Sequence, residues 1–158
     1  GIIIYATIYL LMNIAVFTIL LALKNNNNYI EKISEFSGLS KHKPLIALSL
    51  AIIMLSMAGI PPFAGFFAKF YIFIAALKAD LILLAILGVL SSVISAFYYL
   101  RIIKIIYFDE YENANFQFNI SSQALALLII SIFLISFFIF YPSLLTSLSA
   151  NISLDYFD

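Results

Sequence analysis

The chain has 158 residues, of which 65% are hydrophobic and only 10% are charged, and its mean hydropathy is +1.12. A soluble domain carries about 25% charged residues, so this composition excludes an ordinary soluble protein and predicts an all-α transmembrane fold. The formal net charge is zero, which gives no electrostatic basis for binding nucleic acid. The absence of cysteine excludes disulfides, iron–sulfur ligation and thiol catalysis in this chain, and the single histidine, His42, cannot form a metal site alone.

The first predicted span covers residues 2–23, about the length that a helix needs to cross a bilayer. Asn13 and Thr18 are its inner polar residues, and we expect them to hydrogen-bond to another helix. Lys24 ends the span, and the four asparagines that follow it are expected to form an exposed loop.

The second span is predicted to be broken, because the apolar run from Leu45 to Leu77 is too long for one straight crossing. We divide it into helices at 45–58 and 63–77. Pro61 and Pro62 between them lack N–H groups, and their rings clash with the carbonyls four residues earlier, those of Met57 and Ala58.

The break itself runs from Gly59 to Pro62. Gly59 tolerates the dihedral angles that a break requires. Carbonyls without a partner are tolerated at membrane depth only where protein or water reaches them. The break should therefore be buried and should line a polar path.

Lys69 is the one charged residue predicted to lie deep in a span. It follows Pro62 by two helical turns, about 10 Å, so the two share a face, and Gly65 on that face would let another helix approach. A lysine at the bilayer centre costs about 2.5–3.5 kcal/mol, and burial disfavours its charged form, so it can exchange a proton near neutral pH. The alternative is snorkelling to the headgroups, which we expect of Lys78, about 13 Å nearer the helix end.

The third span is predicted at 81–108, after a tight turn at Lys78 to Asp80, and the last at 120–148. In the third span the hydroxyl residues recur at helical spacing: Ser91, Ser95 and Tyr98 on one stripe, Ser92 and Tyr99 on the next. We expect Ser91, Ser95, Tyr98 and Tyr99 to order water, while a second interpretation, that the small residues only help helices to pack, stays open.

Four alternating spans would place the Lys24–Pro44 loop and the Arg101–Asn119 region on one side. Six of the eight basic residues lie there: Lys24, Lys32, Lys41, Lys43, Arg101 and Lys104. By the positive-inside rule that side is the cytoplasm, or the matrix of a mitochondrion. All eight acidic residues fall in predicted loops or the tail, so a counter-charge for Lys69 is expected from outside this chain.

The segment from Leu55 to Tyr71, with its Gly-Ile-Pro-Pro and Ala-Lys-Phe-Tyr sequences, closely resembles the motif of NADH dehydrogenase subunit 2. In bacteria this family is called subunit N, and it comprises antiporter-like membrane subunits of respiratory complex I. The segment Ser95–Arg101 and the sequence around Gly38 and Pro44 also resemble that family.

The resemblance implies that this chain is the C-terminal part of a fourteen-helix antiporter-like fold. Lys69 would be its intramembrane proton carrier toward the intermembrane space. The protein would be a multi-pass protein of the mitochondrial inner membrane, with the Lys24–Pro44 and Asp109–Asn119 loops on the matrix side. A composition rich in Ile, Phe, Tyr and Asn fits an A+T-rich organellar genome.

The family's other central residues, a glutamate and lysines on earlier helices, have no counterpart in this chain. The expected partner is therefore an upstream fragment of the same subunit on another chain, together with neighbouring complex I membrane subunits and lipids. Candidates for the contact between the two chains are the small residues Ala6, Ala15, Gly88 and Ala96. FMN, iron–sulfur clusters and ubiquinone would belong to other subunits, and this chain would hold no cofactor or metal.

Two alternatives stay open. The chain could be a non-pumping structural scaffold of the membrane arm, in which Lys69 is a fixed ion-pair partner. It could also be a cation/proton antiporter subunit of the related bacterial type.

Overall fold

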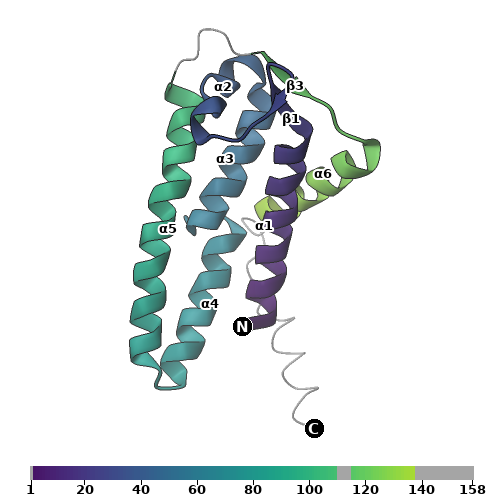
Figure 1. The fold of residues 1–158 in the computed structure, drawn as a ribbon. Coiled ribbons are helices and arrows are strands. Elements are labelled where there is room, and N and C mark those ends of the chain that lie inside the picture. Colours follow the sequence, from purple (N-terminus) through teal and green to yellow (C-terminus); the bar gives the residue numbers. More distant parts are fainter. Residues whose placement is uncertain (1, 110–114, 138–158) are drawn as a thin grey trace.

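The computed structural model describes residues 2–109 and 115–137, which form a helical bundle closed at one end by a small sheet (Figure 1). The long helices are α1 (Ile2–Ala22), α3 (Pro44–Ala58), α4 (Ala64–Lys78) and α5 (Ile82–Phe108), and α6 (Ser122–Phe137) crosses α1 obliquely. The sheet contains β1 (Leu23–Asn25), β2 (Asn28–Tyr29) and β3 (Phe116–Phe118), and it lies beside the 3-10 helix η1 (Ile33–Phe36) and the short helix α2 (Leu39–His42).

The helices lie where the sequence places them. Both ends of α1, α3, α4 and α5 fall within one residue of the predicted bounds. Pro44 is the first residue of α3, a position at which no N–H is needed. The α4–α5 turn closes with Asp80 at a φ of 56°, a left-handed conformation that aspartate tolerates. The predicted last span is described as α6 only to Phe137, and its remainder, with Pro142, lies outside the described residues.

Among the described helices, α1 over Tyr5–Ala22 and α5 are long and apolar enough to cross a membrane, judged by length and composition. α3 and α4 have 15 residues each, fewer than the roughly 20 that a crossing requires. They could cross only as two halves joined end to end. The count of four spans therefore stays a prediction.

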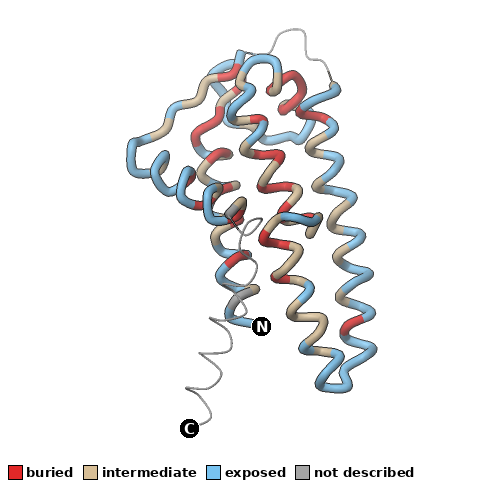
Figure 2. The backbone as a smooth tube through the Cα atoms, turned by 180° about the vertical axis from the view of Figure 1, so that it is seen from behind, coloured by how far each residue is buried: buried red, intermediate tan, exposed pale blue. Residues whose placement is uncertain are grey.

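Burial is concentrated in α1 and α3, whereas α5 is largely exposed (Figure 2). α3 packs mainly against α5, and α1 packs against α6, α4 and α3. Ile19 of α1 and Ile53 of α3 are fully buried, whereas Leu83 of α5 is 71% exposed. An apolar surface of this extent suits contact with lipid or with another membrane subunit.

The segments predicted as plain loops contain the three strands, which is a correction to the sequence interpretation. β1 and β2 form a hairpin whose turn residues, Asn26 and Asn27, have φ values of 51° and 66°. Asparagine is one of the few residues that accept this left-handed conformation, which a two-residue hairpin needs. β1 also pairs antiparallel with β3, with Lys24 opposite Gln117. The 24–44 and 115–119 segments therefore lie at the same end of the bundle.

The expectation of interhelical hydrogen bonds from α1 is wrong within the described chain. The Asn13 side-chain amide donates to the Tyr9 carbonyl at 2.8 Å, and the Thr18 hydroxyl donates to the Ile14 carbonyl at 2.7 Å. Both bonds run to the carbonyl one turn earlier in the same helix, which such side chains reach without any partner.

Candidate functional site

The α3–α4 interruption occupies residues 59–63. Gly59 ends α3 with a φ of +81°, and its N–H donates to the Ser56 carbonyl at 2.9 Å. Glycine is the residue best suited to this left-handed position at a helix end. Pro61 and Pro62 are exposed on this chain, so the expectation of a buried break holds only for its α3 side, where Ala58 is buried. Proline has no N–H group that needs a partner, so its exposure leaves no donor unsatisfied, and the carbonyls released by the two prolines are those of Met57 and Ala58.

The Lys69 amine bridges the break. Its Nζ donates to the Met57 carbonyl at 2.9 Å and to the Ala58 carbonyl at 3.4 Å. These are the two carbonyls that Pro61 and Pro62 leave without the N–H of a continuous helix. Lys69 thus replaces both lost helical hydrogen bonds with one side chain.

The lysine stem passes close to Gly59. A Cβ atom added to Gly59 would lie 3.1 Å from Lys69 Cδ and 3.4 Å from Nζ. Gly59 therefore serves two purposes, the left-handed turn and the space for the stem.

A cavity of about 210 Å³ lies beside the amine. Four helices contribute to its lining: Tyr5, Tyr9 and Met12 from α1, Met57 from α3, Gly65, Ala68 and Lys69 from α4, and Ser91, Ser92, Ser95 and Tyr99 from α5. The structure thus brings Lys69 together with three predicted water-ordering residues, Ser91, Ser95 and Tyr99.

Tyr98, the fourth, does not line this cavity. It is 56% exposed and meets Phe97 edge-on with the ring centroids 5.6 Å apart. Adjacent residues are about 100° apart around a helix, so Tyr98 turns away where Tyr99 faces the cavity.

Sequence reasoning missed Tyr5 and Tyr9, whose rings stack 5.9 Å apart at the cavity wall. Their spacing of four residues on an apolar helix is a signal that could have identified them, because such residues share a face. Ser92 also lines the cavity; the sequence interpretation placed it on the hydroxyl stripe with Tyr99 but did not name it among the water-ordering residues.

Two of the three serine hydroxyls in the cavity wall, those of Ser91 and Ser95, donate their protons within their own helix. Ser91 Oγ donates to the Gly88 carbonyl and Ser95 Oγ donates to the Ser91 carbonyl, each at 2.9 Å. A hydroxyl has two acceptor lone pairs in addition to its donor. These oxygens can therefore accept hydrogen bonds from water or from an ammonium group.

A second cavity, of about 310 Å³, also borders Lys69 and is lined by residues of α4 and α5 together with Ala58 and Gly59. Its lining is mostly apolar and includes Phe66, Phe70, Phe73 and Val93. Lys69, which is partly buried, thus borders both a polar space and an apolar one. Within residues 2–109 and 115–137, its hydrogen-bond partners are the two carbonyls, and no carboxylate forms an ion pair with it.

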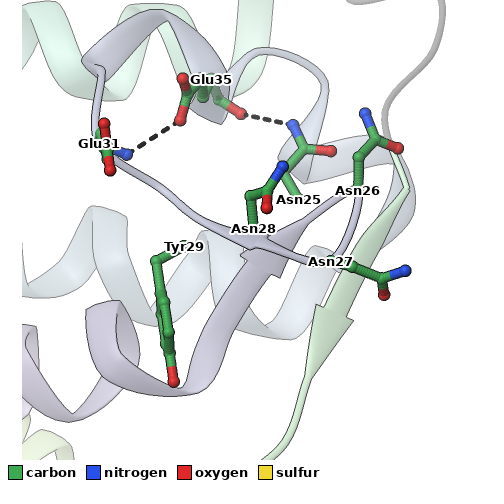
Figure 3. Close-up of a pocket in the computed structure, with 7 residues that line it drawn as sticks. All are labelled: Asn25, Asn26, Asn27, Asn28, Tyr29, Glu31 and Glu35. Carbon is green, nitrogen blue, oxygen red and sulfur yellow. Dashed lines mark hydrogen bonds between the residues drawn. The ribbon is translucent and has the colours of Figure 1, made fainter.

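A third hollow lies far from the break, at the sheet end, and is lined by Asn25 to Asn28, Tyr29, Glu31 and Glu35 (Figure 3). The Glu35 carboxylate accepts the N–H groups of Glu31 at 2.9 Å and Lys32 at 3.4 Å, so it stabilises the loop. Across the described residues, no group of three or more His, Cys, Asp or Glu side chains is placed to hold a metal ion. The Lys69 cavity is therefore the candidate functional site.

Comparison with known proteins identifies the family to which this chain belongs. Residues 1–95, which include the break and Lys69, match the model of the NADH:quinone oxidoreductase/Mrp antiporter transmembrane family. The chain belongs to this family. The membership confirms the resemblance first suggested by the segment Leu55–Tyr71.

Relatives from the antiporter family cover most of this chain. It is 48% identical over 143 residues to NADH-quinone oxidoreductase subunit N of Parvibaculum lavamentivorans, covering 90% of this chain and 29% of that protein. It is 46% identical over 136 residues to NADH-ubiquinone oxidoreductase chain 2 of Marchantia polymorpha, covering 86% and 27%. The chain thus spans less than a third of the length of these curated relatives.

The fold also matches a chain of known structure. A chain of respiratory complex I from Thermus thermophilus superimposes with a TM-score of 0.72 at 23% sequence identity, over 90% of this chain and 33% of that one. At this identity the match establishes the fold, and the mostly helical architecture is that of a complex I chain.

Proposed function

We propose that this chain is part of a proton-translocating membrane subunit of NADH:ubiquinone oxidoreductase, with Lys69 as its intramembrane proton carrier toward the intermembrane space. Membership of the antiporter family and the names of the relatives support the general assignment. The observation that carries the proposal is the Lys69 amine, which is bonded to the released carbonyls and faces a polar cavity.

The chemistry of the amine suits reversible protonation at this place. A lysine ammonium has three N–H donors, and the two carbonyls use two of them. The neutral amine keeps two N–H groups and gains a lone pair. Both carbonyl bonds can therefore persist while the third proton is exchanged, so the carrier stays in position in either charge state.

The cavity offers a route for that third proton. Its serine and tyrosine hydroxyls come from α1 and α5 and can order a short chain of water. A route that continues toward either surface needs further groups, and these would come from an upstream fragment of the same subunit on another chain. The glutamate and lysines that the resemblance places on earlier helices are the expected relay.

The proposal includes partners and location. Neighbouring complex I membrane subunits and lipids would surround the chain, and FMN, iron–sulfur clusters and ubiquinone would act in other subunits. The Marchantia relative supports a mitochondrial inner membrane. The basic residues at the sheet end support placing the Lys24–Pro44 and Asp109–Asn119 segments on the matrix side, with four spans in the membrane.

A second candidate function is a non-pumping scaffold. The same two hydrogen bonds favour it, because a lysine that repairs a broken helix could be retained for stability alone. A cation/proton antiporter role is a third candidate, since the matched family includes Mrp antiporters.

Replacement of Lys69 separates these functions. In the assembled complex, Lys69→Ala should lower the number of protons moved per electron while the amount of complex falls only slightly. Each carbonyl that loses the amine should cost about 1–3 kcal/mol at most, and less where water from the adjacent cavity bonds to it. The measurements are proton translocation by vesicles during NADH oxidation and complex abundance on native gels.

The control is Lys78→Ala, which removes the exposed lysine at the end of the same helix and should leave both quantities unchanged. A normal proton ratio combined with loss of assembly in Lys69→Ala would favour the scaffold. A proton flux that depends on added Na⁺ or K⁺ in the unmodified complex would favour the antiporter.

A further inference from the structure

Ser56, in the last turn of α3, is fully buried and makes an unusual contact across the helix break. Its Oγ accepts the backbone N–H of Gly65 at 3.0 Å. The two residues belong to different helices, and the bond spans the entire 59–63 interruption.

This bond does for α4 what a capping residue usually does. The first N–H groups of a helix lack intrahelical partners, and a side-chain oxygen just before the helix normally accepts one of them. The residue in that position is Phe63, which makes no side-chain capping bond. Ser56 supplies the missing acceptor from the preceding helix.

The backbones of the two helices also touch at this point. A Cβ atom added to Gly65 would overlap the Ser56 carbonyl oxygen, so only glycine fits. That carbonyl already accepts the Gly59 N–H at 2.9 Å. Ser56 is therefore bonded both to the end of α3 and to the start of α4.

The contact lies directly beside the Lys69 bridge. Gly65 is one helical turn before Lys69 on the same face, and Ser56 immediately precedes Met57, whose carbonyl accepts the amine at 2.9 Å. The Ser56–Gly65 bond thus fixes the part of α4 that carries Lys69 relative to the end of α3 that carries the acceptor carbonyls.

We propose that Ser56 is a positioning residue that caps α4 across the break and thereby holds the Lys69 amine on the Met57 and Ala58 carbonyls. Its importance for transport rests on the proposed carrier role of Lys69. The effect of Ser56 on the position of the Lys69 amine is independent of that carrier role and can be measured separately.

The test measures how readily the Lys69 amine reacts with an acetylating reagent. The assembled complex is treated briefly with acetic anhydride, and mass spectrometry gives the acetylation of Lys69 relative to Lys78, an exposed lysine on the same helix. In Ser56→Ala this ratio should rise by about fivefold, the factor that corresponds to loss of a cap worth about 1 kcal/mol. An unchanged ratio overturns the proposal.

Ser49→Ala is the matched control. Ser49 lies two turns earlier on the same face of α3, and its hydroxyl donates to the Leu45 carbonyl of its own helix at 2.9 Å. The same substitution there should leave the ratio at the wild-type value. If Ser56→Ala fails to assemble, Ser56→Cys replaces it, because sulfur is a weaker acceptor of similar size. For Ser56→Cys, a Lys69-to-Lys78 acetylation ratio above the wild-type value, by up to about fivefold, supports the proposal. A ratio equal to the wild-type value overturns it.

A second readout separates positioning from general stability. In a Lys69→Ala background, Ser56→Ala should cause no further loss of proton translocation, because the group that it positions is gone. An additional loss equal to that seen with Lys69 present overturns the positioning role. Normal translocation in Lys69→Ala itself would refute the proposed function, while the acetylation ratio would still decide the position of the amine.

Discussion

At the scale of single residues, the sequence predicted which carbonyls are released and where Lys69 lies, but not that the Lys69 amine bonds to those carbonyls. The positions of Pro61 and Pro62 identified the released carbonyls of Met57 and Ala58. Helical spacing placed Lys69 on the same helix face as Pro62. That the amine reaches those carbonyls depends on the turn at residues 59–63, whose direction no periodic pattern encodes. The counter-charge expected for Lys69 from outside this chain stays a prediction, and its partners among the described residues are neutral backbone carbonyls.

Gly65 provides a stability prediction at this scale. Gly65→Ala should destabilise the protein by about 1–3 kcal/mol, because the new methyl group overlaps the Ser56 carbonyl and a backbone atom cannot move aside easily. The measurement is the midpoint of thermal dissociation of the assembled complex.

Gly88→Ala in α5 is the matched control. Its added Cβ would meet Phe73 Cε1 at 2.7 Å, but a ring at the end of a side chain can rotate away. It should therefore cost clearly less than Gly65→Ala. Equal midpoints for the two variants would contradict the backbone contact.

At the scale of elements, apolar runs and proline positions predicted the helices well, and the strands were missed. β1 and β2 contain lysine, asparagine and tyrosine rather than a run of alternating apolar residues, so they resemble a loop. The Phe-Gln-Phe sequence of β3 alternates, but three residues are too few to identify a strand from sequence. The pairing of β1 with β3 joins residues about 90 positions apart, as the bond between Asn115 and Asn25 illustrates.

Asn25 connects the segments at the sheet end, and its removal tests their importance. Its side chain accepts the Asn115 N–H at 3.1 Å and donates to the Glu35 carbonyl at 3.2 Å. Asn25→Ala should therefore destabilise the sheet by about 1–2 kcal/mol and speed amide hydrogen exchange in β1 and β3.

Asn28→Ala is the comparison, because Asn28 is exposed in the neighbouring strand. A surface substitution of this kind should change stability by at most about 0.5 kcal/mol. If both variants exchange at the same rate in β3, the Asn25 contacts do not hold the sheet together.

At the scale of the whole molecule, the exposed apolar surface fits the proposed contact with another membrane chain or with lipid. Of the small residues considered for the seam between chains, Ala15 is fully buried within this chain and Gly88 faces Phe73 of α4. Ala6 is exposed and Ala96 is partly buried, so these two remain candidates. Most of α5 is apolar and exposed, which suits a chain that spans less than a third of its relatives' length.

The central claim is that Lys69 acts by exchanging a proton and not merely by closing the break. Lys69→Arg tests it most directly, since arginine keeps the charge and the N–H donors that bond to the carbonyls but does not lose its proton in proteins. The decisive measurement is the number of protons moved per electron in the assembled Lys69→Arg complex. We predict a ratio as low as that of Lys69→Ala with normal assembly, and a wild-type ratio would contradict the account.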